Sequence, residues 1–252
     1  MSATHLQCPI CNFSAHLYDV VDLNKSCAEA MGIHLPISGE PIYYAYCQAC
    51  GFCYAPTMCA WSLDTFRQKI YNQDYAAIDP DYIEKRPSHN ANWLVKLFKD
   101  LPKEIQHLDY GGGNGMLSDL LKQAGWDSVS YDPFNLTDTP MQQLGKFDLL
   151  TAFEVFEHVP DVEVLMHQLC SLLNENGLII FSTLVSDGHI LPHQRLTWWY
   201  ASPRNGHISL FSNKALQLCA QKFQFNLASF NDGLHIMFRD QPVWANHLFE
   251  SS

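Results

Sequence analysis

The chain has 252 residues, of which 47% are hydrophobic; this excludes extended disorder and leaves room for an α/β domain plus a small module. Fifteen Lys and Arg residues oppose 26 Asp and Glu residues, and the net charge of -11 predicts no nucleic-acid partner, because an acidic surface repels phosphate backbones. No apolar run reaches about 18 residues, so we expect no membrane partner. The first residues lack the basic and then apolar segments of a signal peptide, so we expect a cytoplasmic location.

Residues 1–60 hold two Cys-x-x-Cys motifs. In a reducing cytoplasm disulfides are a poor explanation for them, whereas four thiolates at this spacing can hold one tetrahedral structural Zn²⁺. We therefore predict a small zinc-ribbon-like module whose ligands are Cys8, Cys11, Cys47 and Cys50. Free buried cysteines are the alternative, and Cys53 is a substitute ligand. The remaining cysteines are expected to pack as small apolar side chains: Cys27, Cys59, Cys170 and Cys219.

Residues 61–103 favour helices. The run from Trp61 to Asp64 has the residues of a helix start, and apolar side chains recur at helical spacing over 92–101. We interpret this region as a helical linker or lid that precedes a domain over residues 104–252.

Residues 104–252 alternate between strand and helix patterns. We expect strands over 105–110, 128–131, 147–153, 178–184, 225–230 and 234–238. Helices are expected over 116–124, 162–173 and 212–223, with turns at 174–177 and 231–233 and a long loop over about 185–209. This order predicts an α/β fold with a Rossmann-like, mostly parallel sheet that ends in an antiparallel hairpin.

The strongest chemical signal is an acid-led glycine turn between the first of these strands and the first helix. It reads Asp-x-Gly-x-Gly-x-Gly from Asp109 to Gly115, and such a turn lets a ligand approach the backbone at a helix N-terminus. A dinucleotide fingerprint would need glycine where Met116 stands, and no P-loop lysine follows. A second acid, Asp132, ends the next strand, where a carboxylate can accept hydrogen bonds from both hydroxyls of a ribose.

A third motif, the run from Glu154 to His158, follows the 147–153 strand. Together the three motifs resemble those of class I S-adenosylmethionine (SAM)-dependent methyltransferases, over about residues 105–240. The resemblance implies SAM as cofactor, with the acid of the glycine motif helping to hold the methionine part. The cofactor-binding residues it implies are Asp109, Gly111, Gly113, Gly115, Asp132, Pro133, Glu154 and Val155. One departure is that only about fourteen residues separate Asp132 from Lys146, so we expect the third strand of that fold to be shortened or missing.

The methyl acceptor is expected beneath the loop over 186–209, because loops at the carboxyl ends of strands carry function. A general base would remove a proton from the acceptor. We rank His207 first, then His193, then His158, with Tyr200 as a helper. The alternative is a purely structural lid. In the helical region, the residues that could close over the methionine end are Tyr71, Tyr75 and Arg86.

An N-terminal zinc module before such a domain resembles sugar C-methyltransferases and related enzymes of polysaccharide and natural-product pathways. The resemblance implies C- or O-methylation of a small molecule, with a sugar nucleotide or glycan as the first choice. A SAM-binding zinc protein that acts as an interaction module is the alternative. A nucleic-acid methyltransferase is disfavoured by the acidity and by the missing Asn/Asp-Pro-Pro-Tyr motif. The pair Glu157–His158 is similar to one that helps bind a divalent metal in some ubiquinone-pathway O-methyltransferases, but here we expect His158 to orient its loop.

Overall fold

The structure, a computed structural model, describes residues 6–135 and 139–249. Their contacts define two compact units, and each unit is assembled from separate segments of the chain. Unit 1 contains 6–80, Phe156–Leu165 and Thr183–Lys222, and unit 2 contains Asp81–Val155, Met166–Ser182 and 223–249. The domain boundaries that composition suggested, at residues 60 and 103, stay predictions.

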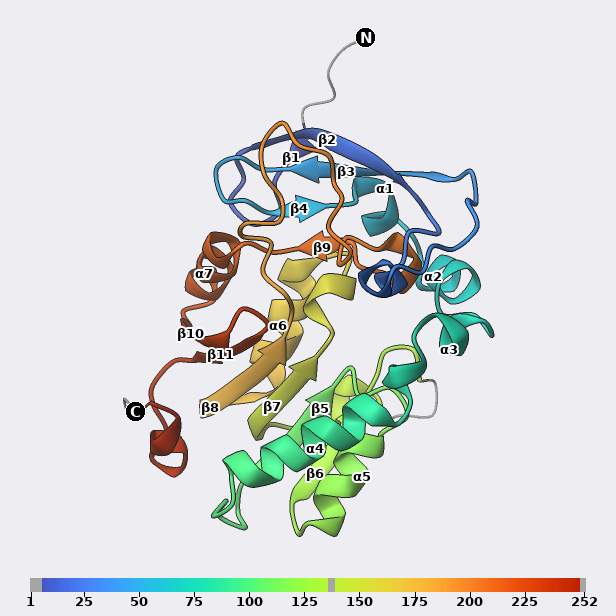
Figure 1. Cartoon of the computed structure of the whole chain (residues 1–252). Helices are drawn as coiled ribbons and strands as arrows, with labels where there is room; N and C mark the ends of the chain where they lie inside the picture. Colours follow the sequence, from blue (N-terminus) through green and yellow to red (C-terminus); the bar gives the residue numbers. More distant parts are fainter. Residues whose placement is uncertain (1–5, 136–138, 250–252) are drawn as a thin grey trace. The chain divides into compact units, whose positions relative to one another are not determined.

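Unit 2 is built on a six-stranded sheet with the order β10-β11-β8-β7-β5-β6 (Figure 1). The strands are β5 (Gln106–Tyr110), β6 (Asp127–Tyr131), β7 (Phe147–Phe153), β8 (Leu173–Ser182), β10 (Asn226–Asn231) and β11 (Leu234–Phe238). The strands β5, β6, β7 and β8 run parallel, whereas β11 is antiparallel to both β8 and β10. The predicted Rossmann-like sheet with a terminal antiparallel hairpin is therefore confirmed. Within the described ranges no strand pairs with the outer side of β6, as expected for a missing third strand.

The core of unit 2 forms where the sheet meets helices α4 (Lys85–Leu97) and α5 (Met116–Gln123), which pack against each other. The strand β7 reads as a continuous apolar run because a parallel central strand is buried on both faces. The side chains of Leu94, Leu121 and Leu149 are completely buried in this cluster. Two short 3-10 helices also lie in unit 2, at Met141–Gln143 and Val243–Leu248, and the helix α6 (Val162–Leu172) runs from unit 1 into unit 2.

Unit 1 contains a five-stranded antiparallel sheet with the order β1-β2-β3-β4-β9. Its strands are β1 (Leu6–Gln7), β2 (Ser14–Asp22), β3 (Pro41–Tyr46), β4 (Cys53–Tyr54) and β9 (Ser209–Leu210). The helices are α1 (Pro56–Cys59), α2 (Leu63–Lys69), α3 (Tyr75–Ile78) and α7 (Asn213–Lys222), with 3-10 turns at Cys27–Met31, Phe156–His158 and Pro203–Asn205. A further 3-10 turn, Pro80–Tyr82, begins where unit 1 ends.

Local signals in the sequence predicted several ends of elements correctly. The hydroxyl of Ser212 accepts from the backbone N–H of Ala215 and so caps α7. The hydroxyl of Ser62 does the same for α2, at the predicted helix start. In the predicted hairpin turn, the side chain of Asn231 accepts from the N–H of Gly233 at 2.8 Å.

The turn predicted at residues 174–177 is wrong, because these residues belong to β8. The register along β7 jumps from Phe147 paired with Leu173 to Leu149 paired with Leu178, so the extra residues form a bulge inside the strand. The side-chain amide of Asn174 donates to Asp148 at 2.7 Å. A Cβ at Gly177 would lie 2.9 Å from the Asp148 carbonyl oxygen, so the glycine marks a close backbone approach rather than a turn.

Candidate functional site

The glycine turn after β5 is held against the end of β6. The backbone N–H groups of Gly111 and Gly112 donate to the carbonyl of Tyr131 at 2.7 and 3.2 Å. Gly111 has a φ of +75°, and a Cβ on it would lie 2.5 Å from the Cγ2 of Val155. The predicted residue Val155 therefore packs directly on the turn, and only glycine fits at position 111.

The second acid lies beside this turn. The carboxylate of Asp132 accepts from the N–H of Gly113 at 2.9 Å and from the N–H of Phe134 at 2.7 Å. Nothing lies within 4 Å of the position that a Cβ on Gly113 would take, so this part of the turn borders open space. Asp109 and Asp132 are thus gathered at one edge of the sheet, as the sequence motif predicts.

Asp109 is almost completely buried at the end of β5. The hydroxyl of Thr151, on the neighbouring strand β7, donates to its Oδ1 atom at 2.8 Å. Burial raises the pKa of Asp109 to about 7, the Thr151 hydrogen bond opposes this shift, and the charge of Asp132 adds to it. A buried acid of this kind gains most from a cationic ligand, since an opposite charge favours its ionised form.

A third carboxylate, Glu154, follows β7. Its φ of +54° is unusual for a residue that is not glycine, and such strained positions cluster at functional sites. The hydroxyl of Ser182 donates to its Oε1 at 2.7 Å, and the guanidinium of Arg86 lies 3.4 Å from its Oε2. The structure therefore brings the predicted residues Arg86 and Glu154 together. The other two predicted positions are Pro133, which is exposed, and Gly115, which stands at the start of α5.

The side chains gathered at this site suit a nucleoside that carries a cationic amino-acid part. Three carboxylates, Asp109, Asp132 and Glu154, come from the ends of three adjacent parallel strands, and an open glycine backbone lies beside Asp132. Ribose hydroxyls suit a carboxylate such as Asp132, and a buried acid suits a positive charge. When bound, SAM supplies a methyl group on a positively charged sulfur.

The four predicted zinc ligands come together in unit 1. Their sulfur atoms all lie within 4.8 Å of one another, with 3.6 Å between Cys8 and Cys50 and 3.5 Å between Cys11 and Cys47. Zn–S bonds of about 2.3 Å at a tetrahedral centre would put neighbouring sulfurs about 3.8 Å apart. Cys53 lies outside this group, in β4, where burial raises the pKa of its thiol.

The two cysteine knuckles have the same backbone hydrogen bonds. The N–H of Cys8 donates to the carbonyl of residue 13, and the N–H of residue 12 donates back to the carbonyl of Cys8. The N–H of Cys47 donates in the same way to residue 52, and Gly51 donates to Cys47. Residues 12 and 51 both have a positive φ, with Asn12 taking the role that glycine has in the second knuckle.

A second group of polar side chains gathers in unit 1. The hydroxyl of Tyr200 donates to the carboxylate of the fully buried Glu157 at 2.6 Å. The Nδ1 of His207 lies 2.8 Å from the carbonyl oxygen of Tyr200, and the rings of His158 and His207 are 4.8 Å apart. The hydroxyl of Tyr71 lies 3.1 Å from the Nδ1 of His158. We refer to Glu157, His158, Tyr200 and His207 as the histidine cluster.

The glycine before His207 makes this cluster possible. Gly206 has a φ of +89°, and a Cβ on it would lie 3.0 Å from both the Nδ1 of His158 and the hydroxyl of Tyr71. His193, the second-ranked base, is exposed and is not among the residues that the described contacts join to the cluster. Glu157 was not among the predicted catalytic residues, although its place in the motif before His158 was the available signal.

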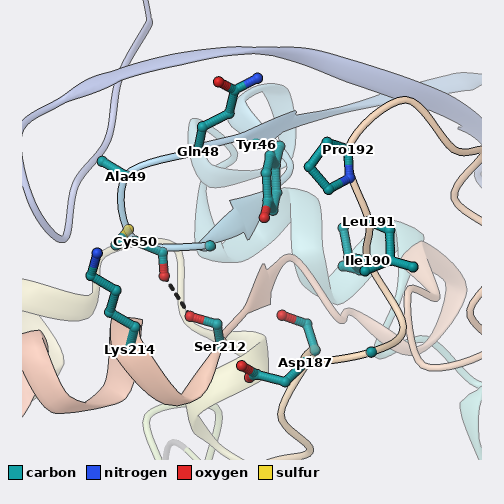
Figure 2. Close-up of a pocket in the computed structure, with 13 residues that line it drawn as sticks. Tyr46, Gln48, Ala49, Cys50, Asp187, Ile190, Leu191, Pro192, Ser212 and Lys214 are labelled. Carbon is teal, nitrogen blue, oxygen red and sulfur yellow. Dashed lines mark hydrogen bonds between the residues drawn. The ribbon is translucent and has the colours of Figure 1, made fainter.

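A cavity of about 290 Å³ in unit 1 borders the second knuckle, residues 186–192 and the start of α7. Figure 2 shows the hydroxyl of Ser212 donating to the carbonyl of Cys50, two residues that line this cavity. The carboxylate of Asp187 accepts from the N–H of Asn213 at 2.7 Å. Ser212 and Asp187 therefore cap the start of α7, and Ser212 also ties it to the second knuckle.

The fold and the match to a family model define a SAM-dependent methyltransferase of class I, and the candidate site has side chains that suit this cofactor. The model of a methyltransferase-domain family matches residues 82–229, more than half of the chain, and the chain belongs to this family. It is similar to the Burkholderia thailandensis 1,6-didemethyltoxoflavin-N1-methyltransferase, solved with S-adenosylhomocysteine (SAH). That match has a TM-score of 0.52 and 15% identity over 81% of this chain and 96% of the other.

The curated relatives include proteins named ubiquinone biosynthesis O-methyltransferase. The protein from Bordetella avium is 29% identical over 133 residues, which cover 42% of this chain and 55% of the relative. The protein from Azorhizobium caulinodans is 29% identical over 126 residues, which cover 41% of this chain and 48% of the relative. The chain thus spans about half the length of the curated relatives it matches. Over the described residues, every helix is too short or too polar to cross a membrane.

Proposed function

We propose that this methyltransferase transfers a methyl group from SAM to a hydroxyl of a small molecule, with His207 as the general base. The relatives named as O-methyltransferases support an oxygen acceptor. A sugar nucleotide or glycan, which the N-terminal module suggested, is a second acceptor class, and C-methylation would use the same base at an acidic carbon. A base is needed in both cases because a neutral hydroxyl or C–H group is a poor nucleophile.

The observation that carries the proposal is the hydrogen bond between His207 and the Tyr200 carbonyl. A carbonyl oxygen only accepts, so the Nδ1 of His207 carries a hydrogen, and Nε2 is the nitrogen that we assign to proton removal. The Tyr200 hydroxyl in turn donates to Glu157, so one residue orients both the base and the acid beside it. Glu157 follows Glu154, which the sequence motif assigns to cofactor binding, by three positions in the sequence.

Replacing the base tests this assignment. We expect His207→Gln to lower turnover by about 10²-fold or more, the usual contribution of a general base, while the affinity for SAH stays within about twofold. His193→Gln is the matched control, since His193 belongs to the same loop but is exposed, and its turnover should not change. SAH formation is measured against hydroxylated aromatic compounds and sugar nucleotides. Equal turnover of both variants would reject His207 as the base.

Binding of the cofactor is tested before any acceptor is known. Calorimetric titration with SAH should give one site per chain, and Asp132→Ala should weaken it strongly, because the variant loses a carboxylate suited to a ribose. A chain that binds neither SAM nor SAH would contradict a catalytic role.

We also propose that the four sulfurs of the knuckles hold one structural Zn²⁺. Four thiolates close a tetrahedral site, so this ion has no open position and no part in catalysis. Its role is to stabilise a small module that lacks a large core of its own, because binding energy at such a site is also folding energy.

A further inference from the structure

A series of hydrogen-bonded, buried polar side chains on strands β6, β5 and β7 ends at Asp109. It begins at Ser128 on β6, whose hydroxyl lies 2.7 Å from the Nδ1 of His107 on β5. The Nε2 of His107 lies 3.0 Å from the hydroxyl of Thr151 on β7, and that hydroxyl donates to Asp109 at 2.8 Å. All four side chains are at most 4% exposed, so water does not replace these bonds.

The chemistry of these groups sets the direction of every hydrogen bond. Burial lowers the pKa of His107 to about 3, so its ring is neutral and has one donor and one acceptor nitrogen. Thr151 has a single hydroxyl hydrogen and gives it to Asp109, so its oxygen accepts from the Nε2–H of His107. The Nδ1 of His107 then accepts from Ser128. All three hydrogens point toward Asp109, the arrangement that suits an ionised carboxylate.

We infer that Thr151 and His107 are positioning residues for Asp109, which orient its carboxylate and favour its ionised form so that it can face the cationic methionine end of SAM. This inference rests on the proposed role of Asp109 in cofactor binding. Neither residue contacts the cofactor in this proposal, because each acts through Asp109. Among the described residues, the ionisable groups that act on Asp109 are Asp132, through its charge, and His107, through Thr151.

The network has a clear consequence for the pH dependence of binding. The hydrogen bond from Thr151 lowers the pKa of Asp109, while burial and the charge of Asp132 raise it. Removing this donor shifts the balance toward the protonated acid. The ionised acid can pair with the α-ammonium group at the methionine end, which SAM and SAH both carry. The affinity for SAH should therefore fall about tenfold for each pH unit below the pKa of Asp109. Loss of the donor should therefore move the whole profile to higher pH.

The test compares Thr151→Val with Thr151→Ser, and it measures SAH affinity by calorimetry between pH 5 and 9. Valine keeps the shape and loses the hydroxyl, whereas serine keeps the hydroxyl. We expect the midpoint of the wild-type profile near the pKa of Asp109, the same midpoint in the serine variant, and a midpoint about one unit higher or more in the valine variant. A purely structural role would weaken binding equally at every pH.

Thr151→Val leaves the buried N–H of His107 without its acceptor, which can unfold the protein. The triple variant Ser128→Ala, His107→Leu and Thr151→Val removes every partner in the network, so no buried donor is left unpaired, and the same upward shift is expected from it. In wild-type protein, ¹⁵N NMR above pH 8 should find the His107 hydrogen on Nε2. Finding it on Nδ1 would overturn the inferred direction of the network.

Failure of this inference and failure of the proposed function give different results. If wild-type protein binds SAH and the valine and serine variants share one midpoint, the positioning role is wrong and the methyltransferase assignment stands. If wild-type protein does not bind SAH at any pH, the cofactor role of Asp109 is wrong, and the inference that rests on it falls too.

Discussion

Asp109, the buried acid of the proposed cofactor site, should reduce the stability of the protein when no ligand is bound. Burial and the charge of Asp132 raise the pKa of Asp109 from 3.8 to about 7. Between these two values the folded protein binds a proton that the unfolded chain has already lost. Stability is therefore lost as the pH rises from about 4 to 7, and it stays low above pH 7.

The size of this effect follows from the shift. About three pKa units at 1.36 kcal/mol each correspond to up to ~4 kcal/mol. Asp109→Asn cannot ionise, and its amide oxygen can still accept from Thr151. We therefore expect Asp109→Asn to have nearly the stability of wild type at pH 4 and to be more stable by up to ~4 kcal/mol at pH 8, while its affinity for SAH falls.

The assay is denaturant unfolding without ligand, followed by tryptophan fluorescence at several pH values. Asp119→Asn serves as the control because Asp119 is exposed on α5 and ion-pairs with Lys122 at the surface. The difference between variant and wild type should grow with pH only for Asp109→Asn. A difference that is the same at pH 4 and pH 8 would refute the assignment of Asp109 as a destabilised buried acid.

Two further changes test the glycine turn and the metal site. Gly111→Ala should abolish SAH binding, because its Cβ would lie 2.5 Å from Val155. Gly125→Ala is the control, since Gly125 has a similar positive φ and open space around it. This control should lower the free energy of unfolding by only about 1–2 kcal/mol. Cys50→Ser should lower bound zinc from one ion per chain toward none and lower the unfolding temperature, whereas Cys170→Ser, far from the knuckles in sequence, should keep the metal. Elemental analysis and thermal unfolding measure the second pair, and equal zinc content in both cysteine variants would contradict the proposed site.

Short-range patterns in the sequence determined much of this protein. The strand–glycine–helix motif at 109–115, the two cysteine knuckles and the hairpin turn at 231–233 each depend on residues within a few positions of one another. Their backbone bonds form locally, as between Cys47 and Gly51, so the residue pattern and the structure coincide. The position of Asp132 followed for a similar reason, since parallel strands end at one edge of a sheet.

Only the tertiary structure decided which distant side chains meet. Thr151 joins His107 and Asp109 across strands more than 40 residues apart, and Tyr200 reaches Glu157 over 43 residues. The bulge in β8 and the pairing of β9 with β4 also depend on neighbours that no local pattern names. Periodicity reports which face of an element is buried, but the partner of a buried polar group depends on register and packing, which are properties of the whole fold.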